Sequence, residues 1–148
     1  MVEYNKPTHT MIEYLADNMR QQDVNELHAA HEQPILQVLI DSIEMSEKAD
    51  MVFIDGDLVG VIGLREMDGF SIPWFLGTNF VNKHRKVFMR ESKKIIDAMP
   101  NKLLNMVHAD NKVSIKWLKA LGFTLNEPLS CGRHGELFHQ FHRGFKNV

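Results

Sequence analysis

Two apolar runs joined by a tight turn constrain this fold more than any other part of the chain. The stretch MVFIDGDLVGVIGL, residues 51–64, places runs rich in β-branched residues on either side of Asp55-Gly56-Asp57. Aspartate and glycine tolerate the positive φ that a tight hairpin turn requires. We therefore predict a β-hairpin here, so the fold must contain an antiparallel pair of strands.

The residues before the hairpin favour helices. Thr8–Tyr14 is compatible with a strand or with the start of a helix, and we predict a first strand there. Over Leu15–His31 apolar residues recur at broadly helical spacing, which predicts one or two amphipathic helices, with Asp23 able to cap a second segment that begins at Val24. Pro34 suits a first helical turn, and the single apolar stripe of ILQVLIDSIEMS after it predicts a further helix.

The residues after the hairpin alternate between strand and helix. SIPWFLGT, residues 71–78, is an apolar run in which Pro73 has no N–H for a neighbouring strand, so we predict a strand that is bulged or splayed at Pro73. Helical spacing returns over Lys86–Met99. LLNMVHA predicts a strand and Asn111–Leu121 a helix, which Gly122 ends. The segments FTLNEPL and ELFHQFHR predict two closing strands.

The predicted order is β-α-α-β-β-β-α-β-α-β-β. The chain of 148 residues contains no repeat, no low-complexity tract and no linker rich in proline, glycine or serine. We therefore predict one α/β (α+β) domain spanning residues 1–148, with a mixed, mostly antiparallel sheet flanked by helices.

Composition argues against several classes of protein. One cysteine, Cys131, cannot form an internal disulfide or a cysteine-based structural zinc site. The formal charge of −2, from 17 basic and 19 acidic residues, argues against general nucleic-acid binding. No stretch approaches the roughly 20 apolar residues of a membrane span, and the N-terminus does not resemble a signal peptide. We expect a protein without a membrane span that stays in the cell that makes it.

A histidine pair is the strongest candidate for metal binding. His28 and His31 are three residues apart and can share a helix face, but the sequence supplies no third ligand near them. We therefore predict no metal site.

Several segments, taken in order, resemble the GNAT N-acetyltransferase superfamily. Asn111 to Phe123, NKVSIKWLKALGF, is similar to a family segment in which an asparagine after the fifth strand opens a helix that ends in Leu-Gly-Phe. Together with VFIDGDLVGVIGL, WFLGT, RKVFMRESKKIIDAM and FHQFHR, it resembles a GNAT-like family of tailed bacteriophages that includes internal virion proteins of short-tailed phages. The resemblance implies a GNAT-like sheet and a phage-encoded protein of the bacterial host cytoplasm that can be packaged in the virion.

The resemblance also implies a place for acetyl-CoA or CoA. GNAT enzymes hold this cofactor where the fourth and fifth strands separate, with the pyrophosphate on N–H groups at the start of the next helix. The matching residues here are Phe75, Leu76, Gly77, Lys83, His84, Arg85, Lys86 and Asn111.

The chain departs from the family at the pyrophosphate loop. When Arg85 is matched to the first position of the family's loop, Phe88 and Arg90 stand where small residues normally let the backbone approach the phosphates. Lys83, His84, Arg85 and Lys86 can still attract a phosphate as point charges, or they can form a solvated basic helix start. The resemblance alone leaves cofactor binding open.

The second departure concerns the proton donor. The family commonly has a tyrosine seven residues after the asparagine, and this chain has Leu118, which has no proton to donate. His108 or Glu91 can substitute as acid or base, although a histidine at a strand end is more often structural. Asn111 can cap its helix or contact the pantetheine arm, and capping is the favoured reading.

Two functions follow from the resemblance. The favoured one is a catalytically degenerate, virion-associated or assembly protein, whose partners are other phage virion proteins or a host protein. The alternative is an active acetyl-CoA-dependent N-acetyltransferase that modifies a small amine or a host protein. Fold alone does not decide between them, so the departures at Phe88, Arg90 and Leu118 favour the first.

Overall fold

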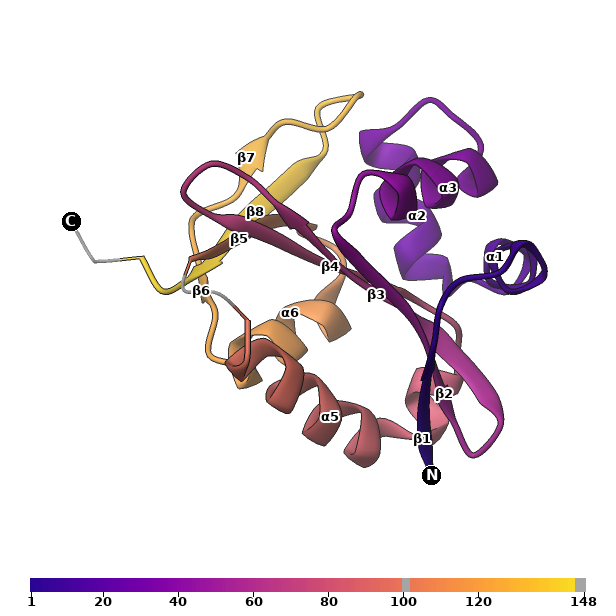
Figure 1. Ribbon diagram of the computed structural model, residues 1–148. Coiled ribbons are helices and arrows are strands. Elements are labelled where there is room, and N and C mark those ends of the chain that lie inside the picture. Colours follow the sequence, from indigo (N-terminus) through magenta and orange to yellow (C-terminus); the bar gives the residue numbers. More distant parts are fainter. Residues whose placement is uncertain (100–101, 146–148) are drawn as a thin grey trace.

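The computed structural model describes residues 1–99 and 102–145. Within them eight strands form one sheet in the order β1-β2-β3-β4-β5-β8-β6, with β7 paired to β8 (Figure 1). The strands are β1 (Val2–Asn5), β2 (Lys48–Ile54), β3 (Asp57–Glu66), β4 (Ser71–Gly77), β5 (Leu103–His108), β6 (Thr124–Leu125), β7 (Leu129–Ser130) and β8 (Leu137–Arg143). The helices are α1 (His9–Asp17), α2 (Gln21–Ala30), α3 (Ile35–Glu44), α4 (Phe80–Lys83), α5 (Arg85–Asp97) and α6 (Lys112–Ala120).

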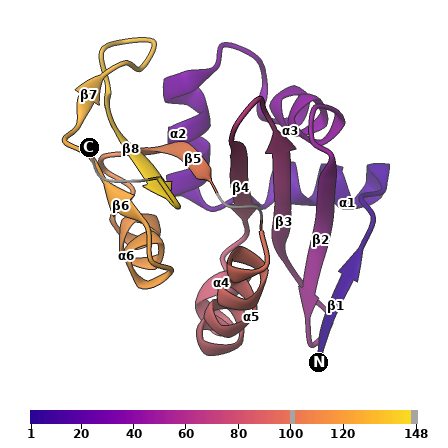
Figure 2. The ribbon, with the colours of Figure 1, turned by 60° about the vertical axis from the view of Figure 1, so that its left-hand side comes forward.

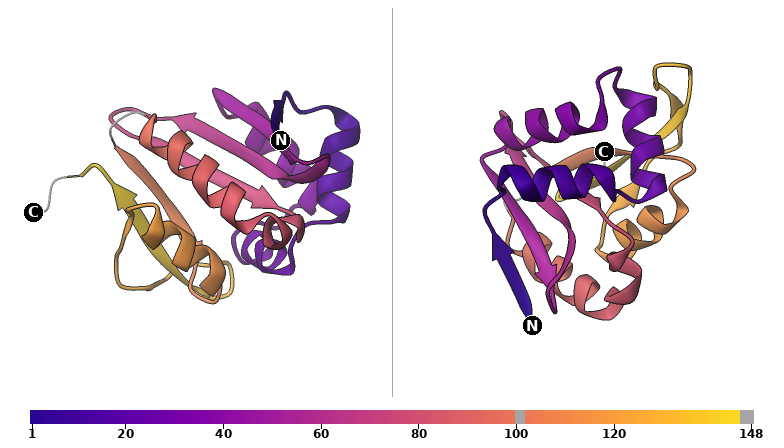
Figure 3. Two further views of the ribbon diagram at one scale, coloured as in Figure 1. Left: turned by 90° about the horizontal axis from the view of Figure 1, so that it is seen from below. Right: turned by 90° about the vertical axis from the view of Figure 1, so that its right-hand side faces the viewer.

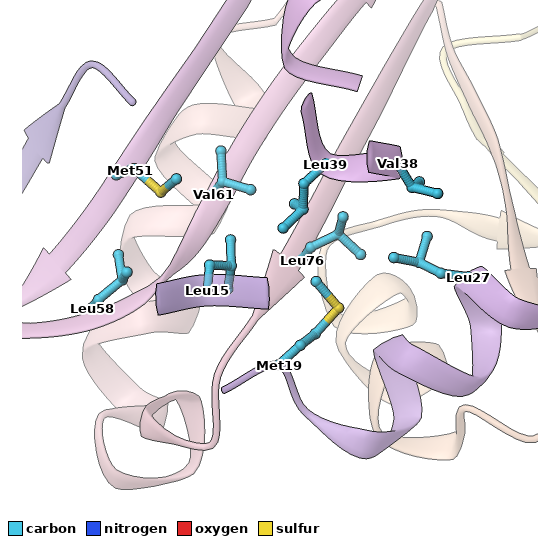
Figure 4. Close-up of a cluster of buried hydrophobic side chains, with 9 residues drawn as sticks. All are labelled: Leu15, Met19, Leu27, Val38, Leu39, Met51, Leu58, Val61 and Leu76. Carbon is cyan, nitrogen blue, oxygen red and sulfur yellow. The ribbon is translucent and has the colours of Figure 1, made fainter. Parts of the chain in front are cut away.

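Helices cover both faces of the sheet. α1, α2 and α3 lie on one face, and α5 and α6 lie on the other (Figures 1 and 3). The strands serve both faces because successive side chains point in opposite directions. Met51 and Val61 pack with α1 and α3 in the cluster drawn in Figure 4, whereas Val52 packs with Phe88 of α5.

The predicted hairpin is confirmed. β2 and β3 are antiparallel neighbours, and they are joined through Asp55 and Gly56, which have φ of 50° and 83°. Two central residues with positive φ match the right-handed twist of the strands. Every other strand in this half of the sheet adds to this pair, since β1 pairs with β2 and β4 pairs with β3.

The first predicted strand is wrong in its position. The strand is Val2–Asn5, and Thr8 instead caps α1, because its Oγ1 accepts a hydrogen bond from Met11 N–H at 3.2 Å. A side-chain cap of this kind satisfies an N–H that the helix itself leaves unpaired. The short apolar run after Thr8 therefore belongs to a helix, on which Met11 and Ile12 are half-buried, Tyr14 is exposed and the following Leu15 is fully buried.

The predicted cap of the second helix is also wrong. Two helices do occupy the segment 15–31, but α2 begins at Gln21, so Asp23 lies in its first turn rather than at its cap. Arg20 is the N-cap residue, and it makes no side-chain capping hydrogen bond. The Asp23 side chain is buried, and a buried carboxylate requires hydrogen-bonding or charged partners.

The helices near the C-terminus follow the predictions with small changes. α5 begins at Arg85 and is preceded by the short α4, which the sequence analysis did not predict. α6 ends as predicted at Gly122, which has a φ of 91°. Phe123 N–H donates to Leu118 C=O at 3.0 Å and Gly122 N–H donates to Lys119 C=O at 3.1 Å. These two bonds form a Schellman cap.

The closing strands are shorter and more numerous than predicted. FTLNEPL contributes only Thr124–Leu125 as β6, and a second short strand, Leu129–Ser130, pairs with β8. β8 matches the second predicted closing strand. Within the described residues no helix has both the length and the apolar character needed to cross a membrane.

The sheet divides between β4 and β5. Figure 2 shows a part formed by β1 to β4 and a part formed by β5 to β8. The two parallel strands pair only at Ser71 and Leu103 in the described residues. Beyond this point Pro73 C=O accepts a hydrogen bond from the Asn105 side chain at 2.8 Å, in place of a strand partner. Of the two irregularities predicted at Pro73, the splay is confirmed, whereas the register between β3 and β4 runs through Pro73 without a bulge.

Candidate functional site

The split leaves one edge of β4 without a strand partner. Thr78 N–H donates to Val59 C=O of β3 at 2.9 Å, so Gly77 N–H, one residue earlier, faces the split. Because backbone groups alternate along a strand, the N–H and C=O of Phe75 face the split as well. Gly77 N–H donates a hydrogen bond to Asp23 Oδ2 at 2.9 Å. The N–H and C=O of Phe75 are therefore the backbone groups on this edge that remain for a ligand.

The facing edge of β5 is capped by side chains. Met106 N–H donates to Asn105 Oδ1 at 2.7 Å, and His108 N–H donates to Glu26 Oε1 at 2.8 Å. These side chains replace the strand partner that the split removes, since an unpaired buried N–H is costly. Asn105 therefore contacts both edges, because its Nδ2 donates to Pro73 C=O.

Helix α2 supplies one carboxylate to each edge. Asp23 and Glu26 are three residues apart and so lie on one face of the helix. Asp23 caps β4 at Gly77, and Glu26 caps β5 at His108. α2 thus holds the two halves of the sheet apart at a set spacing.

Asp23 is part of a buried ion pair. Arg20 Nε donates to Asp23 Oδ2 at 3.0 Å and Arg20 Nη2 donates to Oδ1 at 2.7 Å, with both side chains 3% exposed. Arg20 also lies over the Trp117 ring, 4.8 Å from its centroid, and its Nη2 is 3.3 Å from Ser114 Oγ. The pair joins α2 to α6 through the split.

A cavity of about 610 Å³ occupies the split. Its walls include Leu27 and Val38 from the helices on one face, and Phe88 and Trp117 from the helices on the other. The cavity therefore passes between the two faces of the sheet. It is of the size that small-molecule sites have.

Glu26 is the ionisable group in this cavity whose proton affinity is most altered. Burial raises the pKa of Glu26 to about 7, with a further increase from the nearby charge of Asp23. The hydrogen bonds from His108 N–H and Asn111 and the charge of Arg20 act in the opposite direction. A carboxyl group with this pKa can take up or release a proton near neutral pH.

The basic residues expected to hold a phosphate lie at the start of α5. Lys83 Nζ and His84 Nε2 both contact Asp57 Oδ2, at 2.9 and 2.8 Å, and these hydrogen bonds lower the pKa of Asp57. Arg85 and Lys86 are exposed. Neither forms an ion pair with a carboxylate of the described residues, whereas Lys83 and His84 do. Arg85 and Lys86 therefore supply the uncompensated positive charge at this helix start.

Phe88 does not lie where the loop alignment placed it. The first backbone hydrogen bond that enters α5 runs from Phe88 N–H to His84 C=O at 2.9 Å, so the N–H groups of Arg85, Lys86 and Val87 precede it. The Phe88 side chain is 7% exposed and packs against Phe75 and Trp117, with ring centroids 4.8 and 5.4 Å apart. It fills the core beneath the helix rather than the approach to its N-terminus.

The two predicted catalytic residues lie apart from each other. The His108 ring accepts the Asp110 N–H at 3.0 Å and packs edge-on against Phe138, and only its backbone contacts Glu26. Glu91 lies on α5 with its Oε2 3.2 Å from Lys94 Nζ, beside a small hollow lined by Tyr4. Neither side chain lines the 610 Å³ cavity.

The residues at the start of α6 do line the cavity. Asn111 is 3% exposed and caps the helix by accepting Ser114 N–H at 3.4 Å, as the capping interpretation predicts. Its Nδ2 is 3.4 Å from Glu26 Oε1. Leu118 also lines the cavity, at the position where a tyrosine was expected from the resemblance.

Sequence reasoning missed Arg20, Asp23 and Glu26. The available signal was weak: two acidic residues three apart on the apolar side of a helix, preceded by an arginine. Nothing local to that segment identifies Gly77 or His108 as their partners, because these lie 54 and 82 residues further along the chain.

Comparisons with known proteins agree on the fold. An acetyltransferase of the GNAT family from Bacillus cereus superposes with a TM-score of 0.65 at 12% identity, covering 99% of each chain. An N-acetyltransferase from Staphylococcus aureus gives 0.63 at 14% identity, covering 97% of each chain. Spermidine N-acetyltransferase from Vibrio cholerae, solved with CoA and spermine, gives 0.61 at 12% identity, covering 95% of this chain and 94% of that one.

The sequence itself matches no family model and no curated protein. At these identities the structural likeness shows the fold alone, which is the single-domain GNAT fold with its mixed, mostly antiparallel sheet.

Proposed function

We propose that this protein is an acyl-CoA-dependent N-acyltransferase that binds acetyl-CoA in the split between β4 and β5. The observation that carries the proposal is the 610 Å³ cavity in that split, with the edge groups of Phe75 free of any strand partner. Acetyl-CoA supplies an acyl thioester, whose pantetheine arm carries amide groups that can pair with such an edge. The cavity and the free N–H and C=O of Phe75 therefore fit the pantetheine arm of acetyl-CoA.

Phosphate recognition is assigned to the start of α5. The N–H groups of Arg85, Lys86 and Val87 precede the first helical hydrogen bond, and the helix dipole favours negative charge there. Lys83 and His84 are held beside this helix start by Asp57. The burial of Phe88 supports the proposal, because it removes one of the two bulky side chains that the loop alignment placed in the path of the phosphates, the other being Arg90.

Isothermal titration with acetyl-CoA and with CoA tests the proposal. We expect micromolar binding, which corresponds to about −8 kcal/mol. The double variant Arg85→Glu/Lys86→Glu should weaken binding at least tenfold. Lys48→Glu changes an exposed lysine at the first residue of β2, the end away from Asp57 and the start of α5, and should leave binding unchanged. No heat and no thermal shift at millimolar ligand would overturn the proposal.

A second candidate is a virion-associated or assembly role in a tailed phage that uses the GNAT-shaped domain as a scaffold. It rests on the sequence resemblance and on Leu118, which offers no proton to a departing thiolate. Mass spectrometry of purified particles tests it, and absence of the protein below one copy per particle would rule out the virion role. Particles that contain the protein would not exclude acyl transfer.

A further inference from the structure

The cavity extends to both faces of the sheet. Val107 packs with α6 in the core, so Met106, the next residue along β5, faces α2. His108 pairs with Phe138 across β5 and β8 and shares that face. The α2 side of the cavity therefore carries an apolar surface formed by Leu27, Val38, Trp74, Leu76, Met106 and Phe138, with the polar side chains of Gln33, Asp41, Ser42 and Ser46 beside it.

Glu26 lines the cavity and reaches from α2 to the end of β5 and the start of α6. Its Oε1 accepts hydrogen bonds from His108 N–H at 2.8 Å and from Asn111 Nδ2 at 3.4 Å. Both bonds end on the same oxygen, which leaves Oε2 without a donor among the described residues. The carboxyl group is thus held in place while one oxygen can still take a proton.

The two other carboxylates that line the cavity are already engaged by donors of the protein. Asp23 is neutralised by Arg20 and already accepts Gly77 N–H. Asp41 of α3 accepts a hydrogen bond from Gln37 at 2.8 Å. The remaining ionisable side chains that line the cavity are His31, which follows α2, and Arg65 of β3. The His108 side chain does not line the cavity, because its ring accepts a hydrogen bond from Asp110 N–H.

We infer that Glu26 accepts the proton of the attacking amine, and that this amine carries an apolar substituent which packs on the α2 side of the cavity. The inference rests on the proposed acyl-CoA function. The amine nitrogen uses its lone pair to form a C–N bond to the thioester carbonyl carbon, and its proton passes to Glu26 Oε2. The C–S bond then breaks, the thiolate of CoA leaves, and Glu26 returns the proton to the thiolate or to water.

Acetyl transfer from acetyl-CoA to 2-phenylethylamine and to ethanolamine, followed by mass spectrometry of the products, tests the inference. We expect kcat/KM for 2-phenylethylamine to exceed that for ethanolamine at least tenfold. Glu26→Gln should lower kcat/KM by roughly 10²–10⁴-fold and remove the inflection near pH 7 from the pH–rate profile, leaving only the rise due to deprotonation of the amine substrate. Glu32→Gln, a mainly exposed glutamate just beyond α2, is the matched control and should keep both the rate and the pH profile.

The outcomes separate this inference from the proposed function. Titration of Glu26→Gln with acetyl-CoA should give the wild-type affinity, so that any loss of rate is a loss of chemistry rather than of cofactor. Acetyl-CoA binding without transfer to either amine, or equal transfer to both, would overturn the apolar acceptor while the cofactor site stands. An unchanged pH profile and rate in Glu26→Gln would overturn the role of Glu26.

Discussion

Asp23 and Glu26, one turn apart on α2, cap the facing edges of two strands that do not pair with each other there. Asp23 Oδ2 accepts Gly77 N–H of β4 at 2.9 Å, and Glu26 Oε1 accepts His108 N–H of β5 at 2.8 Å. The two carboxylates differ in charge balance. Asp23 is paired with Arg20, whereas no cation of the described residues forms an ion pair with Glu26. One residue therefore stabilises the split, and the other can exchange a proton there.

Removing the Asp23 carboxylate should be strongly destabilising. Asp23→Ala leaves the guanidinium of Arg20 buried without its partner and Gly77 N–H without its acceptor. We expect a loss of about 3–5 kcal/mol in the free energy of unfolding, measured by urea denaturation. Asp17→Ala, at an exposed position on α1, should change it by less than about 0.5 kcal/mol. A loss below about 1 kcal/mol for Asp23→Ala would show that the ion pair contributes little.

Glu26 should make stability depend on pH. Its pKa is raised from 4.5 to about 7 in the folded state, so the folded protein binds the proton more tightly than the unfolded chain does. Stability from this group is fully present below about pH 4.5 and is lost as the pH rises to about 7. Glu26→Gln keeps a neutral side chain at every pH, so we expect it to match the wild type at pH 4 and to exceed it by about 1–3 kcal/mol at pH 8. The same difference in the free energy of unfolding between Glu26→Gln and the wild type at both pH values would contradict the raised pKa.

The C-terminal cap of α6 should tolerate only residues that accept a positive φ. Gly122 has a φ of 91°, and a Cβ there would meet Arg143 Nε only at 3.5 Å, so the cost of substitution lies in the backbone and not in a clash. We expect Gly122→Val to lower the free energy of unfolding by about 2–3 kcal/mol. Gly122→Asn should cost less than about 1 kcal/mol, because asparagine enters this region more readily. Equal melting temperatures for Gly122→Val and the wild type would remove this assignment.

Trp117 should contribute through packing at the cavity wall. Its ring is tilted against that of Phe88, with centroids 5.4 Å apart, and it lies under the guanidinium of Arg20, but the residue is only half-buried. We therefore expect Trp117→Ala to cost about 2–4 kcal/mol, at or below the range for fully buried aromatic residues. Lys116→Ala, at the exposed neighbouring position, should cost less than about 0.5 kcal/mol in the same denaturation experiment. Similar losses for the two variants would show that the Trp117 ring is not a structural contact.

The features that the sequence predicted correctly depend on a few neighbouring residues. Asp55 and Gly56 define the hairpin, and Gly122 ends α6, because each meets a backbone requirement within one turn of the chain. Pro73 predicted the splay for a related reason, since a residue without an N–H cannot donate a ladder hydrogen bond to a strand on the side that faces β5. The misplaced first strand shows the limit of such reasoning: a short apolar run suits either element, and the cap at Thr8 decides for a helix.

The order of segments along the chain, together with the resemblance of several of them to the GNAT superfamily, predicted a GNAT-like sheet, which the structure confirms. The sequence by itself thus determined the hairpin turn, the C-terminal cap of α6 and most of the order of strands and helices. Only the tertiary structure decided that Asp23 and Glu26 face the split and that Phe88 lies in the core. The physical reason is distance along the chain: the N–H groups that hold these carboxylates come from residues 54 and 82 positions away, and burial in the folded protein is the main cause of the raised pKa of Glu26. No local pattern encodes a partner or a loss of solvent that arises only when β4, β5 and α2 meet.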